Sequence, residues 1–424
     1  MSTYIRRVVD DQLDRLQLQV PAVSLEGPKA VGKTTTAWQR SSTSHELDDS
    51  NVLSIARANP QRLTEGGEPI LIDEWQKFPE SWDRVRRSVD RDHRPGRFIL
   101  TGSTTLDLPN THSGAGRIVA VRMRPLALSE REIDDTSVSF AQLLNGSRQE
   151  LSGSTSLRLE DYVREIVVGG FPSLRSSDAL HAQANLDGYL ERVVDRDFID
   201  AGQRIRRRDA LLRWMAAYAA ASSTSASFET IRDAAVGGHN DKPSRSATLP
   251  YRDVLQRLWL IDEVPAWLPT SNHLRRLGAT PKYQLADPAL AVRLLGVDID
   301  GLLSGRKIGP KLPRDGSLLG ALFESLVTLG VRVFAQNEGA KVRHLRTSSG
   351  DHEVDLIVVR PDQRILAIEV KLSQNIDGDD VKNLNWLQRE IGEDLVDRVI
   401  ITTGTEAYRR LDGVGVIPLA LLGP

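Results

Sequence analysis

Three charged residues lie inside two apolar segments near the end of the chain. Asp355 belongs to EVDLIVV, and Glu369 and Lys371 belong to RILAIEVKLS. If these segments form a hairpin whose turn is centred on Asp362, Asp355 lies opposite Glu369 and the three charged groups share one face, because side chains alternate along a strand. Two neighbouring carboxylates suit a divalent cation such as Mg²⁺ or Mn²⁺, and a lysine beside them could orient or deprotonate water, or balance phosphate charge. The pattern predicts a metal-dependent phosphodiester-cleaving site.

A third carboxylate can join this site. The segment GSLLGALFESLVTLG reads as a helix, and Glu324 on it has only Gly320 and Ala321 one turn back, which leaves room for a close approach. Mn²⁺ bound there would relieve the repulsion between Asp355 and Glu369 and stabilise residues 316–424. The alternative is a charged hairpin that faces water.

A glycine-rich segment near the start of the chain predicts a nucleotide site. GPKAVGKT follows the apolar run VPAVSL, precedes a helical pattern and satisfies G-x-x-x-x-G-K-[ST]. Backbone N–H groups of such a loop hold phosphate oxygens at a helix N-terminus, the lysine reaches the β- and γ-phosphates, and the threonine ligates Mg²⁺. The predicted ATP-binding residues are Gly27, Pro28, Lys29, Ala30, Val31, Gly32, Lys33, Thr34 and Thr35.

The segment ILIDE supplies two acids directly after an apolar strand. Asp73 would hold the magnesium ion together with Thr34, and Glu74 would polarise the attacking water. A purely structural role, in which Asp73 and Glu74 cap the next helix, is the alternative.

Three further residues are candidates for the nucleotide site. The segment RFILTGST ends in hydroxyl groups, so Thr101 or Ser103 could contact the γ-phosphate, although a plain turn would need the same residues. Arg117 in SGAGRIV could stabilise charge on the transferred phosphate, because such charge needs a preorganised donor. The alternative for Arg117 is a solvated loop residue.

Composition bounds the class of protein. The chain has 424 residues, of which 40% are hydrophobic and 26% charged, and a formal net charge of -2. These values are typical of a soluble globular protein with several domains, and any nucleic-acid surface must be local. Cysteine is absent, which excludes disulfides and thiolate chemistry. The N-terminal residues lack the apolar core of a signal peptide, and no run of about 18 apolar residues occurs. We therefore expect a cytoplasmic protein with no membrane segment.

The hydrophobic pattern suggests how these residues are positioned. Residues 4–17 read as an amphipathic helix with Ile5, Val9, Leu13 and Leu16 on one face. The continuous apolar runs VPAVSLEG, EPILIDEW and GRFILTGS are typical of strands in a doubly wound parallel sheet. Between residues 226 and 290 the order helix, turn, helix, then a strand near Leu260 suits a winged helix. The expected divisions are an N-terminal helix (1–20), a P-loop ATPase domain (21–132), a linker (133–158), a helical region (159–225), a winged-helix-like domain (226–290), a linker (291–315) and a last domain (316–424).

Nearly the whole chain resembles bacterial and archaeal AAA-type ATPases that carry a C-terminal domain of uncharacterised function. The segments that carry the resemblance are GPKAVGKTTT, ILIDEWQKFPESW, RFILTGSTTL, SGAGRIVAVRMRPLALSE, VGGFP, YLERVVDRDF, PKYQLADPAL, EVDLIVV and AIEVKLS. Lys29 stands where such proteins usually carry arginine, a change that keeps the charge.

The resemblance implies an AAA+-like α/β P-loop NTPase, a helical and winged-helix middle, and a C-terminal α/β domain similar to the PD-(D/E)XK restriction-endonuclease fold. It implies an ATPase with Mg²⁺, coupled to a nuclease-like domain that acts on DNA or RNA, and a possible homo-oligomer. The alternative is an ATP-gated DNA- or protein-binding switch whose nuclease fold is inactive. In that case the basic residues Arg204, Arg206, Arg207, Arg208 and Arg245 would help the winged helix to bind DNA.

Overall fold

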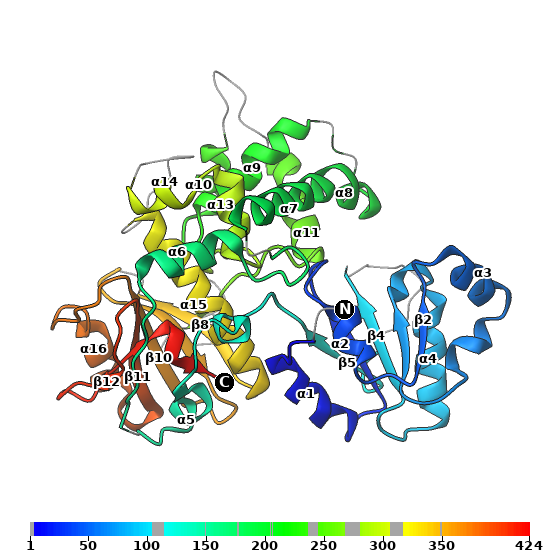
Figure 1. Cartoon of the computed structure of the whole chain (residues 1–424), viewed down its shortest axis with the longest axis horizontal. Coiled ribbons are helices and arrows are strands. Elements are labelled where there is room, and N and C mark those ends of the chain that lie inside the picture. The colour runs from blue at the N-terminus through cyan, green and yellow to red at the C-terminus, as the bar shows by residue number, and fades with distance from the viewer. Residues whose placement is uncertain are drawn as a thin grey trace. The chain divides into compact units, whose positions relative to one another are not determined.

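The computed structural model of the chain contains two compact units (Figure 1). The residues it describes are 4–103, 114–148, 150–175, 178–203, 205, 207–235, 245–267, 280–305, 317–347 and 350–424. Unit 1 consists of Met1–Arg124, Phe171–Ser173 and Val254–Leu260, and unit 2 of Pro125–Gly170, Leu174–Asp253 and Ile261–Pro424.

Unit 1 is built on a five-stranded parallel sheet in the order β2-β3-β4-β1-β5. Its strands are β1 (Ala22–Glu26), β2 (Thr43–Glu46), β3 (Ile70–Asp73), β4 (Phe98–Gly102) and β5 (Ile118–Arg122). Its helices are α1 (Val8–Gln17), α2 (Lys33–Trp38), α3 (Ser50–Ala58) and α4 (Glu80–Arg91), with 3-10 turns at Pro60–Thr64 and Trp75–Lys77. The α/β prediction is confirmed.

The three apolar runs of the sequence form the inner strands. Every residue of β3 and β4 is buried, as expected for strands covered on both faces. Strand β2, with the polar sequence TSHE, lies at one edge of the sheet and is mostly half-buried, so its composition gave no strand signal.

The N-terminal helix is shorter than predicted. It begins at Val8 rather than at residue 4, because the Asp10 carboxylate accepts a hydrogen bond from the backbone N–H of Arg7 and closes the helix start there. Ile5 therefore lies outside the helix and is 38% exposed, whereas Val9 and Leu13 pack into the core as expected.

Unit 2 begins with structure where a linker was predicted. Within residues 133–158, β6 (Val138–Ser139) pairs in parallel with β14 (Leu422–Gly423), and α5 (Phe140–Asn145) packs against the C-terminal sheet. A 3-10 turn at Leu128–Arg131 precedes them. The Ser/Gly-rich composition indicated a loop, but pairing with residues almost 300 positions away made part of it a strand.

The middle of unit 2 is helical, as expected. Its helices are α6 (Leu159–Val168), α7 (Ala179–Arg192), a π-helical turn (Val193–Asp197), α8 (Phe198–Asp200), α9 (Arg208–Ala220), α10 (Phe228–Ala234), the first part of α11 (Arg245–Arg257), α13 (Pro288–Leu295) and α14 (Ile299–Leu303). Helices α10 and α11 are followed by an antiparallel ladder in which Val264 pairs with Lys282 and Ile261 with Leu285. This order is compatible with the winged-helix prediction, which stays a prediction. Helix α14 occupies part of the 291–315 segment that was expected to be a linker.

The C-terminal part of unit 2 is a mixed seven-stranded sheet in the order β12-β13-β11-β10-β9-β8-β7. The strands are β7 (Ala266–Trp267), β8 (Lys341–Arg346), β9 (Glu353–Val359), β10 (Ile365–Lys371), β11 (Leu395–Thr402), β12 (Tyr408–Arg409) and β13 (Gly415–Pro418). Helix α15 (Leu318–Asn337) packs on β8, β9 and β10, and α16 (Lys382–Ile391) packs on β9, β10 and β11. Short 3-10 turns occupy Gly392–Asp394 and Leu419–Leu421.

The hairpin that carries the charged residues has the predicted register. Strand β10 is antiparallel to β9, with Ile365 opposite Val359 and Ile368 opposite Leu356, so the turn is centred on Asp362. The next pair in this register is Glu369 opposite Asp355.

Helix α15 is long and apolar enough to cross a membrane, although its sequence contains no uninterrupted run of about 18 apolar residues. In the structure 67% of its most apolar 18-residue stretch is buried. It is the core helix of the C-terminal region, which accounts for its composition.

Candidate functional site

The loop Gly27–Gly32 connects β1 to α2, so it lies at the carboxyl end of a central parallel strand. A side chain at Gly27 would collide with the carbonyl oxygen of Met123, and Gly32 has a φ of 95°, in the left-handed region. Both positions therefore require glycine. Helix α2 begins at Lys33, so its first N–H groups face this loop.

The Lys33 side chain is folded back into its own loop. Its Nζ donates to the carbonyl oxygens of Gly27 at 3.0 Å and Pro28 at 2.8 Å, and only 5% of the residue is exposed. Burial lowers the pKa of Lys33 to about 8, although Glu74 and Asp73 act in the opposite direction. An arriving phosphate would replace the two carbonyl acceptors with a stronger, charged one.

Asp73 lies at the end of β3, beside the P-loop threonine. The Thr34 hydroxyl donates to Asp73 Oδ1 at 2.8 Å, and the Thr101 hydroxyl donates to the same oxygen. Burial raises the pKa of Asp73, and the two hydroxyl groups oppose this shift. A hydroxyl and a carboxylate in contact beside a phosphate loop are the donor set that Mg²⁺ prefers, so Thr34 and Asp73 fit this ion.

Glu74 is held in an uncommon conformation. Its φ is 52°, in the left-handed region, and its backbone N–H donates to Thr101 Oγ1 at 3.1 Å. Its Oε2 accepts hydrogen bonds from Gln76 Nε2 and, at 3.3 Å, from the Ser103 hydroxyl. The carboxylate is thus fixed beside Asp73. Thr101 and Ser103 both contact these acids, and their contact with the γ-phosphate stays a prediction. Gln76 was missed, since an amide two residues after the acid carries no sequence signal.

Arg117 is not part of this site in its own chain. It directly precedes β5, and β5 runs parallel to β1 with Ile118 opposite Ala22, so Arg117 lies at the amino edge of the sheet. The phosphate loop follows the carboxyl end of β1. Arg117 instead donates to Asp90 Oδ1 at 2.8 Å. The structure therefore does not bring Arg117 to the phosphate loop of its own chain, since spacing along the sequence does not reveal at which edge of the sheet a loop lies.

The segment that leads into α1 braces the loop, which the sequence patterns did not indicate. Arg7 is 5% exposed and donates to the carbonyl oxygens of Val31 at 3.2 Å and Arg124 at 3.0 Å. The Tyr4 hydroxyl lies 3.1 Å from Thr36 Oγ1 on α2. The residues directly before α1 therefore contact both the loop and helix α2, which follows it.

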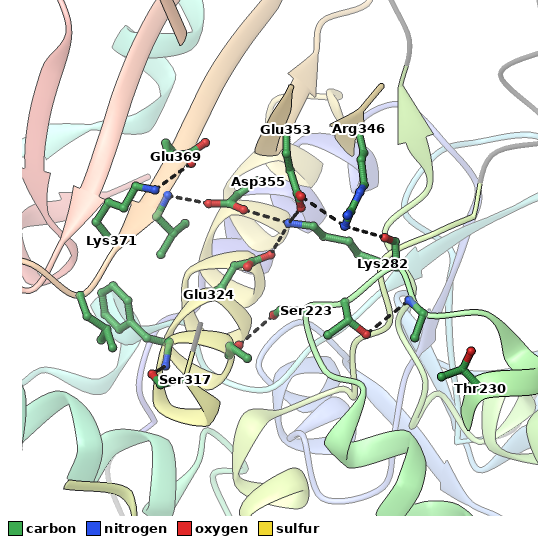
Figure 2. A pocket seen from close by; sticks show the side chains of 18 residues that line it. Ser223, Thr230, Lys282, Ser317, Glu324, Arg346, Glu353, Asp355, Glu369 and Lys371 are labelled. Atoms are coloured by element: carbon green, nitrogen blue, oxygen red, sulfur yellow. Dashed lines mark hydrogen bonds and ion pairs between the residues drawn. The ribbon is translucent and has the colours of Figure 1, made fainter. Parts of the chain in front are cut away.

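A second group of ionisable residues lies in unit 2, around a cavity of about 990 Å³ (Figure 2). Glu324 comes from α15, Glu353 and Asp355 from β9, and Glu369 and Lys371 from β10. The structure thus brings together all four residues predicted for the C-terminal site, together with Glu353, which was not predicted.

Lys282 occupies the centre of these acids. Its Nζ lies 3.0 Å from Glu324 Oε1, 2.9 Å from Glu353 Oε1 and 2.9 Å from Asp355 Oδ1. Figure 2 shows its side chain reaching between the three carboxylates. The pKa of Lys282 is raised well above its usual value, because the neighbouring carboxylates outweigh the effect of burial.

Lys282 belongs to PKYQLADPAL, a segment that carried the family resemblance without a role. Glu324 is 42 positions away and Asp355 73 positions away. No local pattern predicts such a contact.

The pKa values of the two hairpin acids are shifted in opposite directions. Although burial acts to raise it, the pKa of Asp355 is lowered, because Lys282 lies beside it and the backbone N–H of Val370 donates to its Oδ2 at 2.9 Å. Burial and the Asp355 charge raise the pKa of Glu369 to about 8. Lys371 donates to Glu369 Oε1 at 3.1 Å. Among the described residues, Glu369 Oε2 has no hydrogen-bond partner.

The acids of this cluster do not fit a divalent cation as they stand. Within the described part of the chain, no group of three or more His, Cys, Asp or Glu side chains is arranged to hold a metal ion. An ammonium group already lies among the oxygens that would be ligands.

The basic residues considered for DNA binding are only partly within the described regions. Arg204 and Arg206 lie outside them, as does the side chain of Arg245. Arg208, at the start of α9, donates to Asp195 at 2.8 Å.

Comparison with known families divides the chain into three parts. Residues 19–132 match the AAA domain, residues 159–300 match a domain of unknown function (DUF8612), and residues 319–422 match another domain of unknown function (DUF4143). Lys282 therefore falls within the second match, whereas the acids that surround it fall within the third.

Two curated relatives are similar to most of the chain. They are uncharacterized proteins of Mycobacterium bovis and Mycobacterium tuberculosis, each 27% identical over 333 residues. The similarity covers 76% of this chain and 66% of each relative, so the chain spans slightly less than two thirds of their length. The AAA-domain match, on the residues that form the phosphate loop and the Asp73 site, supports an AAA-type ATPase family for this chain.

Proposed function

We propose that this protein binds and hydrolyses ATP in unit 1 and uses its nucleotide state to control the nuclease-like C-terminal region of unit 2. Binding and hydrolysis of ATP are supported by the contact of Thr34 with Asp73 beside the phosphate loop, with the Glu74 carboxylate fixed next to it. Lys33 offsets the charge of the triphosphate, and Mg²⁺ held by Thr34 and Asp73 would supply further charge at the β- and γ-phosphates. Glu74 orients and polarises the attacking water.

Steady-state hydrolysis of ATP by the full chain tests this proposal. Lys33→Ala removes the cation that offsets the triphosphate and should abolish both ATP binding and turnover. Lys77→Ala is the matched control, since Lys77 is exposed and lies outside the site. Unchanged ATP affinity of Lys33→Ala in calorimetry contradicts the assignment.

The proposed coupling is supported by the path of the chain. It passes between the units at residues 124–125, 170–171, 173–174, 253–254 and 260–261, so five covalent connections link them. The short segment Phe171–Ser173 belongs to unit 1, and the Ser173 hydroxyl donates to the Ala30 carbonyl oxygen of the phosphate loop at 3.2 Å. A change in the loop on nucleotide binding would therefore act on a segment whose two ends continue into unit 2.

For the C-terminal region, the geometry favours an ATP-gated switch that binds DNA or protein, because Lys282 occupies the place where a metal-dependent nuclease needs its ion. Cleavage of nucleic acid is the second candidate. It is supported by the register of Asp355 and Glu369 and by Lys371 beside them. We propose that the protein acts in the cytoplasm, and that DNA or RNA and further copies of the chain are candidate partners.

Incubation with labelled single- and double-stranded DNA and RNA separates the two candidates. The reactions contain Mg²⁺ or Mn²⁺, with and without ATP. The switch predicts binding without cleavage, whereas the nuclease predicts cleavage that disappears in Glu369→Ala. Binding to DNA should weaken steeply with salt, because phosphate contacts release counterions.

A further inference from the structure

The ammonium group of Lys282 uses all of its hydrogen-bonding capacity inside the acid cluster. A lysine has three N–H donors, and Lys282 Nζ has three carboxylate oxygens at 2.9 to 3.0 Å, from Glu324, Glu353 and Asp355. These distances are those of charge-assisted hydrogen bonds. Only 1% of the residue is exposed, so the group is not shared with solvent.

The backbone on either side holds Lys282 in place. Its N–H and carbonyl groups both pair with Val264, each at 2.9 Å, and the neighbouring Tyr283 carbonyl accepts from the N–H of Ser223 at 2.8 Å. Arg332 of α15 donates to the Asp262 carbonyl oxygen at 2.8 Å, which ties this ladder to the helix that carries Glu324. The lysine is therefore a fixed part of the site.

A divalent cation cannot share this place with the ammonium group. It would bind the same oxygens at about 2.0–2.6 Å, so it would overlap the position of Lys282 Nζ. Without either cation, three partly buried carboxylates would face one another with no compensating charge. The cluster thus needs one cation, and the chain supplies it.

Glu369 brings a further carboxylate oxygen to the site. Glu369 is 7% exposed and lines the cavity, and within the described residues its Oε2 has no hydrogen-bond partner. This buried oxygen would become a ligand if a metal ion replaced the ammonium group.

We propose that Lys282 is the resident cation of this cluster and takes the place of the divalent metal ion, so that the wild-type site is closed to metal. Glu324, Glu353 and Asp355 are then ligands of an ammonium group. Removing that group opens a divalent-cation site formed by these three acids and Glu369. The inference deepens the C-terminal part of the proposed function, and the ATPase measurements on unit 1 are independent of it.

Thermal unfolding of the full chain without nucleotide, in EDTA or in Mn²⁺, tests the inference. The acid cluster of the wild-type protein should not respond to Mn²⁺. Any rise in melting temperature that Mn²⁺ causes in wild-type protein should therefore persist in Asp355→Asn. Lys282→Met should be less stable than wild type in EDTA and should gain a saturable rise of several degrees in Mn²⁺. The double variant Lys282→Met/Asp355→Asn should lose that rise, which assigns it to this cluster rather than to the phosphate loop. A folded Lys282→Met protein without a Mn²⁺ response overturns the proposal.

A second measurement keeps the inference testable if Lys282→Met does not fold. In EDTA, Asp355→Asn and Glu353→Gln should each lower the melting temperature by several degrees, because each removes a charged partner of Lys282. If the acids were instead a metal site awaiting its ion, the same substitutions would remove repulsion and raise the melting temperature. Such a rise, or a wild-type Mn²⁺ response that Asp355→Asn abolishes, contradicts the proposal.

Discussion

Lys33 is buried among carbonyl groups of its own loop, and burial lowers its pKa to about 8. A bound triphosphate favours the charged form, so ATP binding above this pH requires uptake of a proton. ATP affinity should therefore fall about tenfold between pH 7 and pH 9.

Calorimetry in two buffers of different ionisation enthalpy measures that proton uptake directly. Uptake linked to Lys33 should be small at pH 7 and approach one proton at pH 9. Lys33→Arg is the control, since arginine stays protonated throughout this range. Equal ATP affinity of the wild-type protein at pH 7 and 9 would show that the lysine is charged before binding.

Glu369 makes the stability of the folded protein depend on pH. Burial and the Asp355 charge raise its pKa to about 8, from a usual value of 4.5. Between these two pH values the folded state keeps a proton that the unfolded state has released, so stability falls as pH rises. Glu369→Gln removes this loss, and should gain up to about 3 kcal/mol relative to wild type on going from pH 5.5 to pH 8.

Thermal unfolding at both pH values checks this prediction, with Glu390→Gln on the exposed side of α16 as control. An identical difference between wild type and Glu369→Gln at the two pH values would mean that Glu369 is ionised in the folded protein at both.

At the scale of elements, Asp287 joins two segments of unit 2. Its Oδ1 caps α13 by accepting from the N–H of Ala289 at 2.8 Å, and its Oδ2 accepts from the N–H of Gly170 at 2.7 Å. The residue is fully buried. Asp287→Ala leaves two buried N–H groups without acceptors, which should cost about 3 kcal/mol.

The matched control is Asp298→Ala, which removes the exposed cap of α14. Its cost should be about 1 kcal/mol, because solvent can replace the lost acceptor. Denaturant unfolding of both variants measures the difference. Equal losses of stability in the two variants would show that burial of the Asp287 cap does not increase the cost of removing it.

The elements that were predicted depend on residues close together in the sequence, whereas those that were missed depend on distant partners. The inner strands β1, β3 and β4 of unit 1 and the register of the β9–β10 hairpin were predicted, because continuous apolar runs and the alternation of faces are properties of the chain itself. Strand β6 was missed because only its pairing with β14 makes it a strand. Lys282 was missed for the same reason, since its partners come from α15 and β9.

At the scale of the whole molecule, two chemistries lie in two units that the chain connects repeatedly. Unit 1 carries the phosphate loop with Asp73 and Glu74, and unit 2 carries an acid cluster with its own cation. The residue motifs predicted both groups. The edge of the sheet on which Arg117 lies, and the origin of the lysine in unit 2, depended on the folded chain.

The central claim is that unit 1 hydrolyses ATP with Glu74 as the water-activating group. Its most direct test is ATP hydrolysis by the full chain carrying Glu74→Gln, with ATP binding measured on the same sample. Glu80→Gln, an exposed carboxyl at the start of α4, is the control. The account predicts that Glu74→Gln binds ATP as wild type does but loses turnover by at least about a hundredfold, because the amide keeps the shape and cannot accept the proton. Hydrolysis by Glu74→Gln at the wild-type rate would contradict it.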